Sequence, residues 1–192
     1  MPRLFVAIEL DAAARIAIAL EQKRLKRIAG DEGRSTLKWV KPEHMHLTLA
    51  FLGEVDEERS HALIDAIHQP IPHPAVTIAL GGIGMFPPQG PPRVLWLGLS
   101  AGEADVIAIQ RVVAARVKEA GVELDARPFH PHLTLARWRH SRQSDRRRLA
   151  GVDTREAVAR VEATAVTLVH SRLSSNGPAY TALCDAPLGK RL

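Results

Sequence analysis

The sequence has a single cysteine, Cys184, among its 192 residues, and only 4% of them are aromatic. One cysteine excludes an internal disulfide and a zinc site built on several thiolates. No apolar run is long enough to cross a membrane. The apolar start Met1–Leu10 is interrupted by Glu9 and is too short for the core of a signal peptide. We therefore expect a globular protein that stays in the cytoplasm.

Two common enzyme motifs are missing as well. The stretch Gly81–Gly84 is not followed by a helix with Lys-Ser or Lys-Thr, so it is not a phosphate-binding P-loop. No Gly-x-Ser-x-Gly motif occurs, which argues against a serine hydrolase of the α/β class. The net charge is +5, and arginine, the better bidentate partner of phosphate, far outnumbers lysine. The arginines between Arg137 and Arg148 are candidates for a rim that attracts anions.

Hydrophobic periodicity, caps and breakers divide the chain into alternating elements. The patterns predict helices at Ala12–Ile28, Asp56–Ile67, Glu103–Ala120 and Ser144–Ala150, with Asp11 and Gly30 as the caps of the first. They predict strands at Phe5–Leu10, Leu37–Val40, His46–Leu52, Val76–Ile83, Val94–Leu99, His132–Trp138, Ala163–Leu173 and Tyr180–Leu183. Polar residues 31–36, residues 84–92 and Asn176–Pro178 are predicted as loops or turns.

Strands that follow one another directly favour antiparallel sheets, so the sequence indicates an α+β fold. Each half of the chain has one long helix and one copy of the same five-residue motif. We therefore expect two similar lobes with helices outside and a cleft between them, crossing near Gln69–Pro74. No linker separates independent units, so residues 1–192 are expected to form one bilobal domain.

That motif is His-Leu-Thr-Leu-Ala, which occurs at His46–Ala50 and again at His132–Ala136. Side chains alternate between the two faces of a strand. In each copy the leucines can therefore enter the core, while the histidine and threonine share the opposite face. A structural duplication would explain the leucines, but it gives no reason to keep His and Thr on both polar faces. The repeat thus predicts two histidines that face one cleft.

Two facing imidazoles suit in-line displacement at a phosphodiester. One takes a proton from the attacking oxygen, and the other gives a proton to the leaving oxygen on the opposite side. Imidazole does both because its ordinary pKa is about 6.5. Threonine hydroxyls can donate hydrogen bonds to the non-bridging oxygens, where charge develops. This chemistry needs no metal or other cofactor.

A zinc site is the alternative for the same residues. His44 and His46, and likewise His130 and His132, form His-x-His pairs that could supply four imidazole ligands. No carboxylate or cysteine nearby completes a recognisable ligand set, which argues against this alternative.

The two motifs and their surroundings resemble the 2H phosphoesterase superfamily, and specifically its RNA 2′,3′-cyclic phosphodiesterases, also described as RNA 2′,5′-ligases. The resemblance lies in Arg3–Leu10, in Trp39–Val40 before His46–Gly53, in Phe129–Arg137, and in Leu168–Leu173 with Gly177–Pro178 and Tyr180–Thr181. It implies a bilobal α+β fold, and hydrolysis of a terminal RNA 2′,3′-cyclic phosphate to a 2′-phosphate.

By the same resemblance His46 is the general acid and His132 the general base, while Thr48, Thr134 and Arg137 bind the phosphate. Arg137 lies five residues after His132, so a flat strand would place it on the leucine face. A bulge or a strand end is needed there if Arg137 is to reach the site.

Two other functions stay open. One is a non-catalytic protein that binds RNA ends, and the other is a phosphodiesterase or ligase acting on 2′,5′-linked oligonucleotides. RNA or oligonucleotide ends are the expected partner in all three cases, and a monomer is the expected state.

Overall fold

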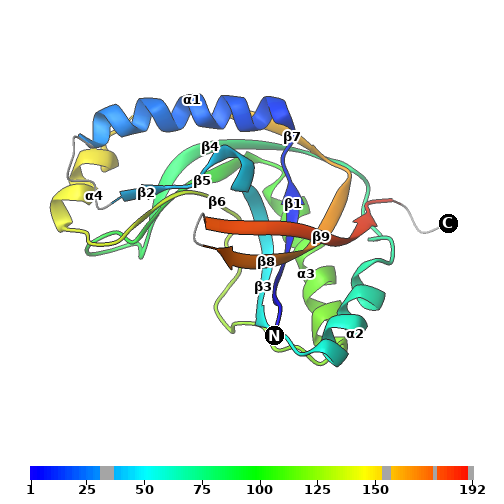
Figure 1. Cartoon of the computed structure of the whole chain (residues 1–192). Helices are drawn as coiled ribbons and strands as arrows, with labels where there is room; N and C mark the ends of the chain where they lie inside the picture. The colour runs from blue at the N-terminus through cyan, green and yellow to red at the C-terminus, as the bar shows by residue number, and fades with distance from the viewer. Residues whose placement is uncertain (31–36, 153–156, 175–176, 190–192) are drawn as a thin grey trace.

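A computed structural model describes residues 1–30, 37–152, 157–174 and 177–189. The elements in chain order are β1 (Arg3–Glu9), α1 (Ala12–Ala29), β2 (Leu37–Trp39), a short 3₁₀ helix η1 (Pro42–His44), β3 (His46–Glu54), α2 (Glu57–Ile67), β4 (Val76–Phe86), β5 (Val94–Ala101), α3 (Glu103–Glu119), β6 (Leu133–Trp138), α4 (Gln143–Ala150), β7 (Ala159–Ala163), β8 (Ala165–Ser174) and β9 (Gly177–Pro187). The α+β class is confirmed (Figure 1).

The strands form two sheets in which all neighbouring strands are antiparallel. The first has the order β3-β1-β8-β9 and the second β2-β6-β5-β4-β7. Each sheet therefore contains one copy of the repeat, in β3 and in β6. The strands β3 and β6 also contact each other, so the two copies meet where the sheets adjoin.

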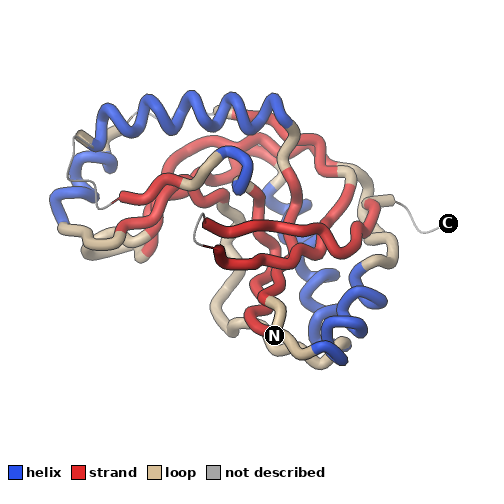
Figure 2. The backbone as a smooth tube through the Cα atoms, in the orientation of Figure 1, coloured by secondary structure: helices blue, strands red, loops and turns tan. Residues whose placement is uncertain are grey.

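The sheets are not consecutive halves of the chain, contrary to the expected crossing at Gln69–Pro74. The early strand β2 pairs with β6 in the second sheet, and the late strands β8 and β9 return to β1 in the first. The long helices are exchanged too, because α1 contacts β7 of the second sheet and α3 contacts β3 of the first. The helices lie outside the strands, as expected (Figure 2).

The helix α1 begins and ends where its caps predict. The side chain of Asp11 accepts a hydrogen bond from the backbone N–H of Ala14 at 2.7 Å, which satisfies one of the free donors of the first turn. Gly30 ends the helix in the left-handed conformation, at φ 64°. Asp56 caps α2 in the same way through the N–H of Arg59.

Several boundaries differ from the sequence prediction. The strand β4 continues beyond Ile83 to Phe86, and β6 begins at Leu133, so His132 immediately precedes its strand. The strand β7 was not predicted, and β9 is longer than Tyr180–Leu183. The loop 31–36 and Asn176 of the expected turn lie outside the described residues.

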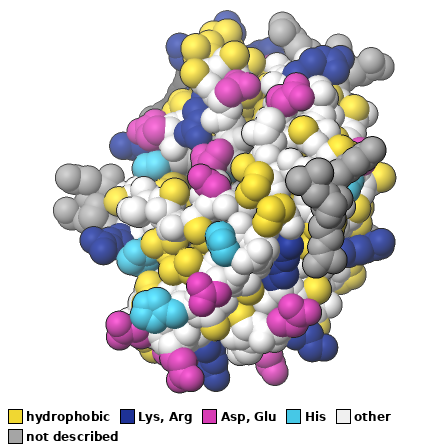
Figure 3. Space-filling view, turned by 90° about the vertical axis from the view of Figure 1, so that its right-hand side faces the viewer, with side chains coloured by type: hydrophobic (Ala, Val, Ile, Leu, Met, Phe, Trp, Pro, Cys, Tyr) yellow, Lys and Arg dark blue, Asp and Glu magenta, His cyan; other side chains and the backbone are white. Residues whose placement is uncertain are grey.

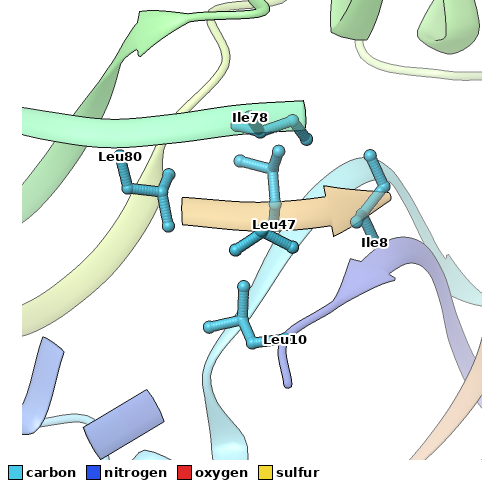
Figure 4. Close-up of a pocket in the computed structure, with 6 residues that line it drawn as sticks. Ile8, Leu10, Leu47, Ile78 and Leu80 are labelled. Carbon is cyan, nitrogen blue, oxygen red and sulfur yellow. The ribbon is translucent and has the colours of Figure 1, made fainter. Parts of the chain in front are cut away.

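One hydrophobic core joins the inner faces of both sheets and the three longer helices. Leu47 of the first repeat packs between Ile8 of its own sheet and Ile78 of the second (Figure 4). The space among these side chains has no room for a water molecule. The leucines of the repeat thus enter the core as predicted, and they fix both motif strands to the same interior. Burying a leucine side chain contributes about 1.5–3 kcal/mol.

Candidate active site

The histidine and threonine of each repeat share the face that points away from the core. In β3, His46 and Thr48 are partly buried, whereas Leu47 and Leu49 are fully buried. Residues 132–135 repeat this pattern, with His132 and Thr134 partly buried and both leucines at 0% exposure. The predicted alternation is confirmed for both copies.

Both repeats contain a β-bulge at the same position. In the first sheet Ala7 pairs with Thr48 and Val6 with Ala50, so Leu49 has no partner in β1. In the second sheet Trp96 pairs with Thr134 and Leu95 with Ala136, so Leu135 is the additional residue. A bulge changes the alternation by one residue. The residue that follows each repeat therefore returns to the face of the histidine.

The bulge in β6 explains how Arg137 comes to lie on the face of the histidine and not on that of the leucines. Leu135 and Ala136 are both buried, and Arg137 is exposed on the same face as Thr134. Its charge lowers the pKa of both His46 and His132. One guanidinium therefore acts on the histidines of both sheets. In the first sheet the equivalent residue is Phe51, which is 63% exposed.

The second bulge is fixed from behind by α1. The carbonyl oxygen of Leu135 accepts hydrogen bonds from Gln22 Nε2 and from the backbone N–H of Val40, both at 2.9 Å. Gln22 Nε2 also donates to the carbonyl of Val40, and the Gln22 side chain is buried. The extra residue of the bulge thus keeps its backbone acceptor satisfied, as buried polar groups require.

Each histidine ring is held by the backbone two residues before it. His132 Nδ1 lies 2.7 Å from the carbonyl oxygen of His130, and the ring of His46 bonds to the backbone of His44. When Nδ1–H of His132 donates to that carbonyl, Nε2 is left to accept a proton. Arg15 fixes the approach to His46, since its guanidinium donates to the carbonyls of Pro42 and Glu43 at 3.3 and 2.8 Å.

Aromatic rings surround both histidines. The ring of His46 stacks on Phe5 with centroids 4.5 Å apart, and Tyr180 of β9 meets it edge-on at 5.4 Å. Around His132 lie Phe86 at 5.0 Å and Trp96 at 6.1 Å. Burial is the main cause that lowers the pKa of His46 to about 4 and lowers the pKa of His132. These surroundings favour the neutral imidazoles in the free protein.

The indole of Trp96 depends on a glycine in the neighbouring strand. A Cβ at Gly84 would lie 2.0 Å from Trp96 Cζ2, so no larger residue fits without moving the ring. The stretch Gly81–Gly84 is not a P-loop, and its last glycine provides the space that the Trp96 ring occupies. Nothing in the spacing of Phe86 and Trp96 along the chain places them beside His132. The pairing of β4 with β5 brings the two rings together, and the pairing of β5 with β6 brings them to the second repeat.

Phe5 and Tyr180 were missed as site residues. All residues from Leu4 to Ile8 are apolar, so the sequence does not show which face of β1 is the site face. In the structure Phe5, Ala7 and Val169 form a small cluster separate from the main core, below His46 and Tyr180.

The zinc alternative finds no ligand set among the residues that the structure describes. In that part of the chain no three His, Cys, Asp or Glu side chains come together in a way that could hold a metal ion. His44 lies in η1 and His130 in the loop before β6, where their backbones support His46 and His132.

Two antiparallel sheets that each present a His-x-Thr strand, with the charge of Arg137 acting on both histidines, define a phosphoesterase of the 2H class. The chain belongs to the 2′-5′ RNA ligase superfamily, whose family model matches residues 16–174.

Relatives named RNA 2′,3′-cyclic phosphodiesterases are similar over most of the chain. The RNA 2′,3′-cyclic phosphodiesterase of Archaeoglobus fulgidus is 30% identical over 178 residues, which cover 93% of this chain and 96% of the relative. That of Escherichia coli is 35% identical over 135 residues, covering 70% and 71% of the two chains.

Solved structures match the fold over nearly the whole chain. TT0787 of Thermus thermophilus matches with a TM-score of 0.79 at 28% identity, covering 99% of this chain and 100% of that one. Escherichia coli LigT in complex with 3′-AMP matches with a TM-score of 0.78, also at 28% identity and with the same coverage.

Proposed function

We propose that this protein hydrolyses RNA 2′,3′-cyclic phosphate ends to 2′-phosphates, with His132 as general base and His46 as general acid. The observation that carries this proposal is the pair of equivalent His-x-Thr strands. The charge of Arg137 lowers the pKa of the histidine in each of them. The activity of the relatives, RNA 2′,3′-cyclic phosphodiesterases by name, supports the same substrate.

The proposed step is a single in-line displacement. His132 takes a proton from water, whose oxygen forms a bond to phosphorus. The bond between phosphorus and the 3′ oxygen breaks, and His46 gives that oxygen its proton. The product carries a 2′-phosphate and a free 3′-hydroxyl, and solvent returns both histidines to their starting protonation states. Thr48 and Thr134 donate hydrogen bonds to the non-bridging oxygens, and Arg137 offsets the charge that develops there.

Arg137 and the phosphate affect the histidines in opposite directions. In the free protein burial and Arg137 both lower the pKa of His46, which has to be protonated to act as an acid. A bound phosphate is negative and favours the charged imidazole, so it raises the pKa again. Substrate binding thus creates the protonation state that the acid needs.

Turnover in the presence of a chelator tests this function. We expect an oligoribonucleotide with a 2′,3′-cyclic phosphate end to be hydrolysed at the same rate with and without excess EDTA. ³¹P NMR of the product should show a 2′-phosphate. Loss of activity in EDTA and recovery with zinc would instead favour the four-histidine metal site.

The other outcomes separate the remaining alternatives. Tight, salt-dependent RNA binding without turnover of any cyclic phosphate would favour a non-catalytic RNA-end binder. If the protein acted only on 2′,5′-linked oligonucleotides, the alternative of a phosphodiesterase or ligase for that linkage would be favoured. A 3′-phosphate product would show that the 2′ oxygen leaves, and it would contradict the assigned step.

We also propose that residues 1–192 act as one catalytic domain, which the interleaved sheets and the shared core support. No helix in the described ranges is long and apolar enough to span a membrane. A monomer in the cytoplasm remains our proposal, and the single cysteine fits a reducing compartment.

A further inference from the structure

Lys38 lies beside Arg137 on the site face of the second sheet. It is the middle residue of β2, and its partner in β6 is Arg137. Its neighbours in the strand, Leu37 and Trp39, pack toward the core, whereas Lys38 is exposed. Directly opposed residues of an antiparallel pair point to the same face, with Cβ atoms about 4.5–5.5 Å apart. Two cations thus stand side by side at the end of the site.

This arrangement costs free energy in the unoccupied protein. Like charges directly opposite each other in a sheet are destabilising. Within the described part of the chain, neither Lys38 nor Arg137 takes part in an ion pair. A polyanion with one phosphate beside each of them would replace the repulsion with two attractions. A pair of this kind is therefore expected where a negatively charged ligand binds.

The two cations differ in their distance from the histidines. Arg137 is in β6, the strand that directly follows His132, whereas Lys38 is in β2, one strand farther out. Lys38 therefore lies beyond Arg137 on the way from His132 to the edge of the sheet. The strand β2 is at the edge of its sheet. A bound RNA strand that runs from the histidines past Arg137 and Lys38 would therefore leave the protein surface at β2.

Other basic side chains lie at this end of the molecule. The helix α4 is at the same end as β2 (Figure 1), and its Arg147 and Arg148 are exposed. The opposite side, shown in Figure 3, has acidic and basic side chains interspersed. A polyanion that extends past β2 therefore meets positive charge.

We propose that Lys38 binds the phosphodiester that precedes the cyclic phosphate, so that the protein distinguishes an RNA end from a free cyclic nucleotide. This inference rests on the proposed function and specifies its substrate. Arg137 acts on the terminal phosphate, which both substrates have. Lys38 acts on the next phosphate, which only the oligonucleotide has.

Two substrates and three variants test this. For Lys38→Met we expect kcat/KM to fall about tenfold on an oligoribonucleotide with a 2′,3′-cyclic end, the loss of one charged contact. On a 2′,3′-cyclic mononucleotide it should not change. The slope of log kcat/KM against log salt should decrease by about 0.7 for the oligonucleotide, as expected for one lost phosphate contact to a single strand. Lys38→Arg should retain most of the preference.

Lys118→Met is the matched control, because Lys118 is exposed in the last turn of α3, a helix that packs on α2 and the first sheet. It should change neither substrate. Equal losses on both substrates in Lys38→Met, no loss on either, or the same selective loss in the control would each overturn the role of Lys38. Wild-type turnover of neither substrate would overturn the proposed function as well.

Discussion

Replacing either histidine of the repeat should remove most of the activity without unfolding the protein. We expect His46→Ala and His132→Ala each to lower kcat about 10²- to 10⁴-fold, the usual contribution of one acid or base. The double variant should be little worse than the poorer single variant, because the two groups act in one step. Both side chains are only partly buried and lie on the face away from the core, so thermal unfolding should change little.

The nature of the leaving group separates the two roles. A substrate with sulfur in place of the 3′ oxygen has a leaving group that needs no proton. We expect His46→Ala to recover much of its activity on this substrate, and His132→Ala to recover none. Recovery in His132→Ala alone would show that His132 is the acid and His46 the base. Near wild-type rates in either variant on the ordinary substrate would remove that residue from the mechanism.

Arg137→Ala should have the next largest effect. Loss of a charge that stabilises the transition state typically costs about 10²–10³ in kcat. In the free protein the same change should raise the pKa of His46 and of His132, because Arg137 lowers both. The rise should be modest, since burial is the larger cause at each histidine. NMR titration of the two imidazoles measures it without substrate.

Two variants control for charge and position. Arg137→Lys retains the charge, so it should leave the histidine pKa values nearly unchanged while losing bidentate contact with phosphate. Arg111→Ala removes an exposed arginine of the helix α3, outside the arginines between Arg137 and Arg148, and it should affect neither activity nor pKa. Unchanged imidazole titrations in Arg137→Ala would show that this guanidinium does not face the two histidines.

The sequence was sufficient to place the two histidines and threonines on one face of their strands, because the alternation there is regular. Strict alternation from His46 to Leu49 and from His132 to Leu135 assigns each side chain to a face, and the structure agrees. Arg137 shows where this reasoning ends. A bulge inserts one unpaired residue without any compositional mark, so periodicity alone places Arg137 on the wrong face.

The pairing of strands that are far apart in the chain could not be predicted from local sequence patterns either. Nothing local in Leu37–Trp39 indicates that it pairs with β6, or that Lys38 is opposed to Arg137. Tyr180 reaches His46 only because β9 returns to the sheet of β1 and β3. The expected division into chain halves failed for the same reason, since each sheet takes strands from both ends of the sequence.

The pH dependence of kcat/KM on a 2′,3′-cyclic RNA end tests the central claim, an acid–base pair of two partly buried histidines, most directly. This parameter reports the free protein, which needs His132 neutral and His46 protonated. Because the pKa of His46 is about 4 and that of His132 is also lowered, we predict a bell with its maximum below pH 6.5. On the alkaline side kcat/KM should fall tenfold per pH unit. A rate that stays constant between pH 5 and 9 would contradict the account.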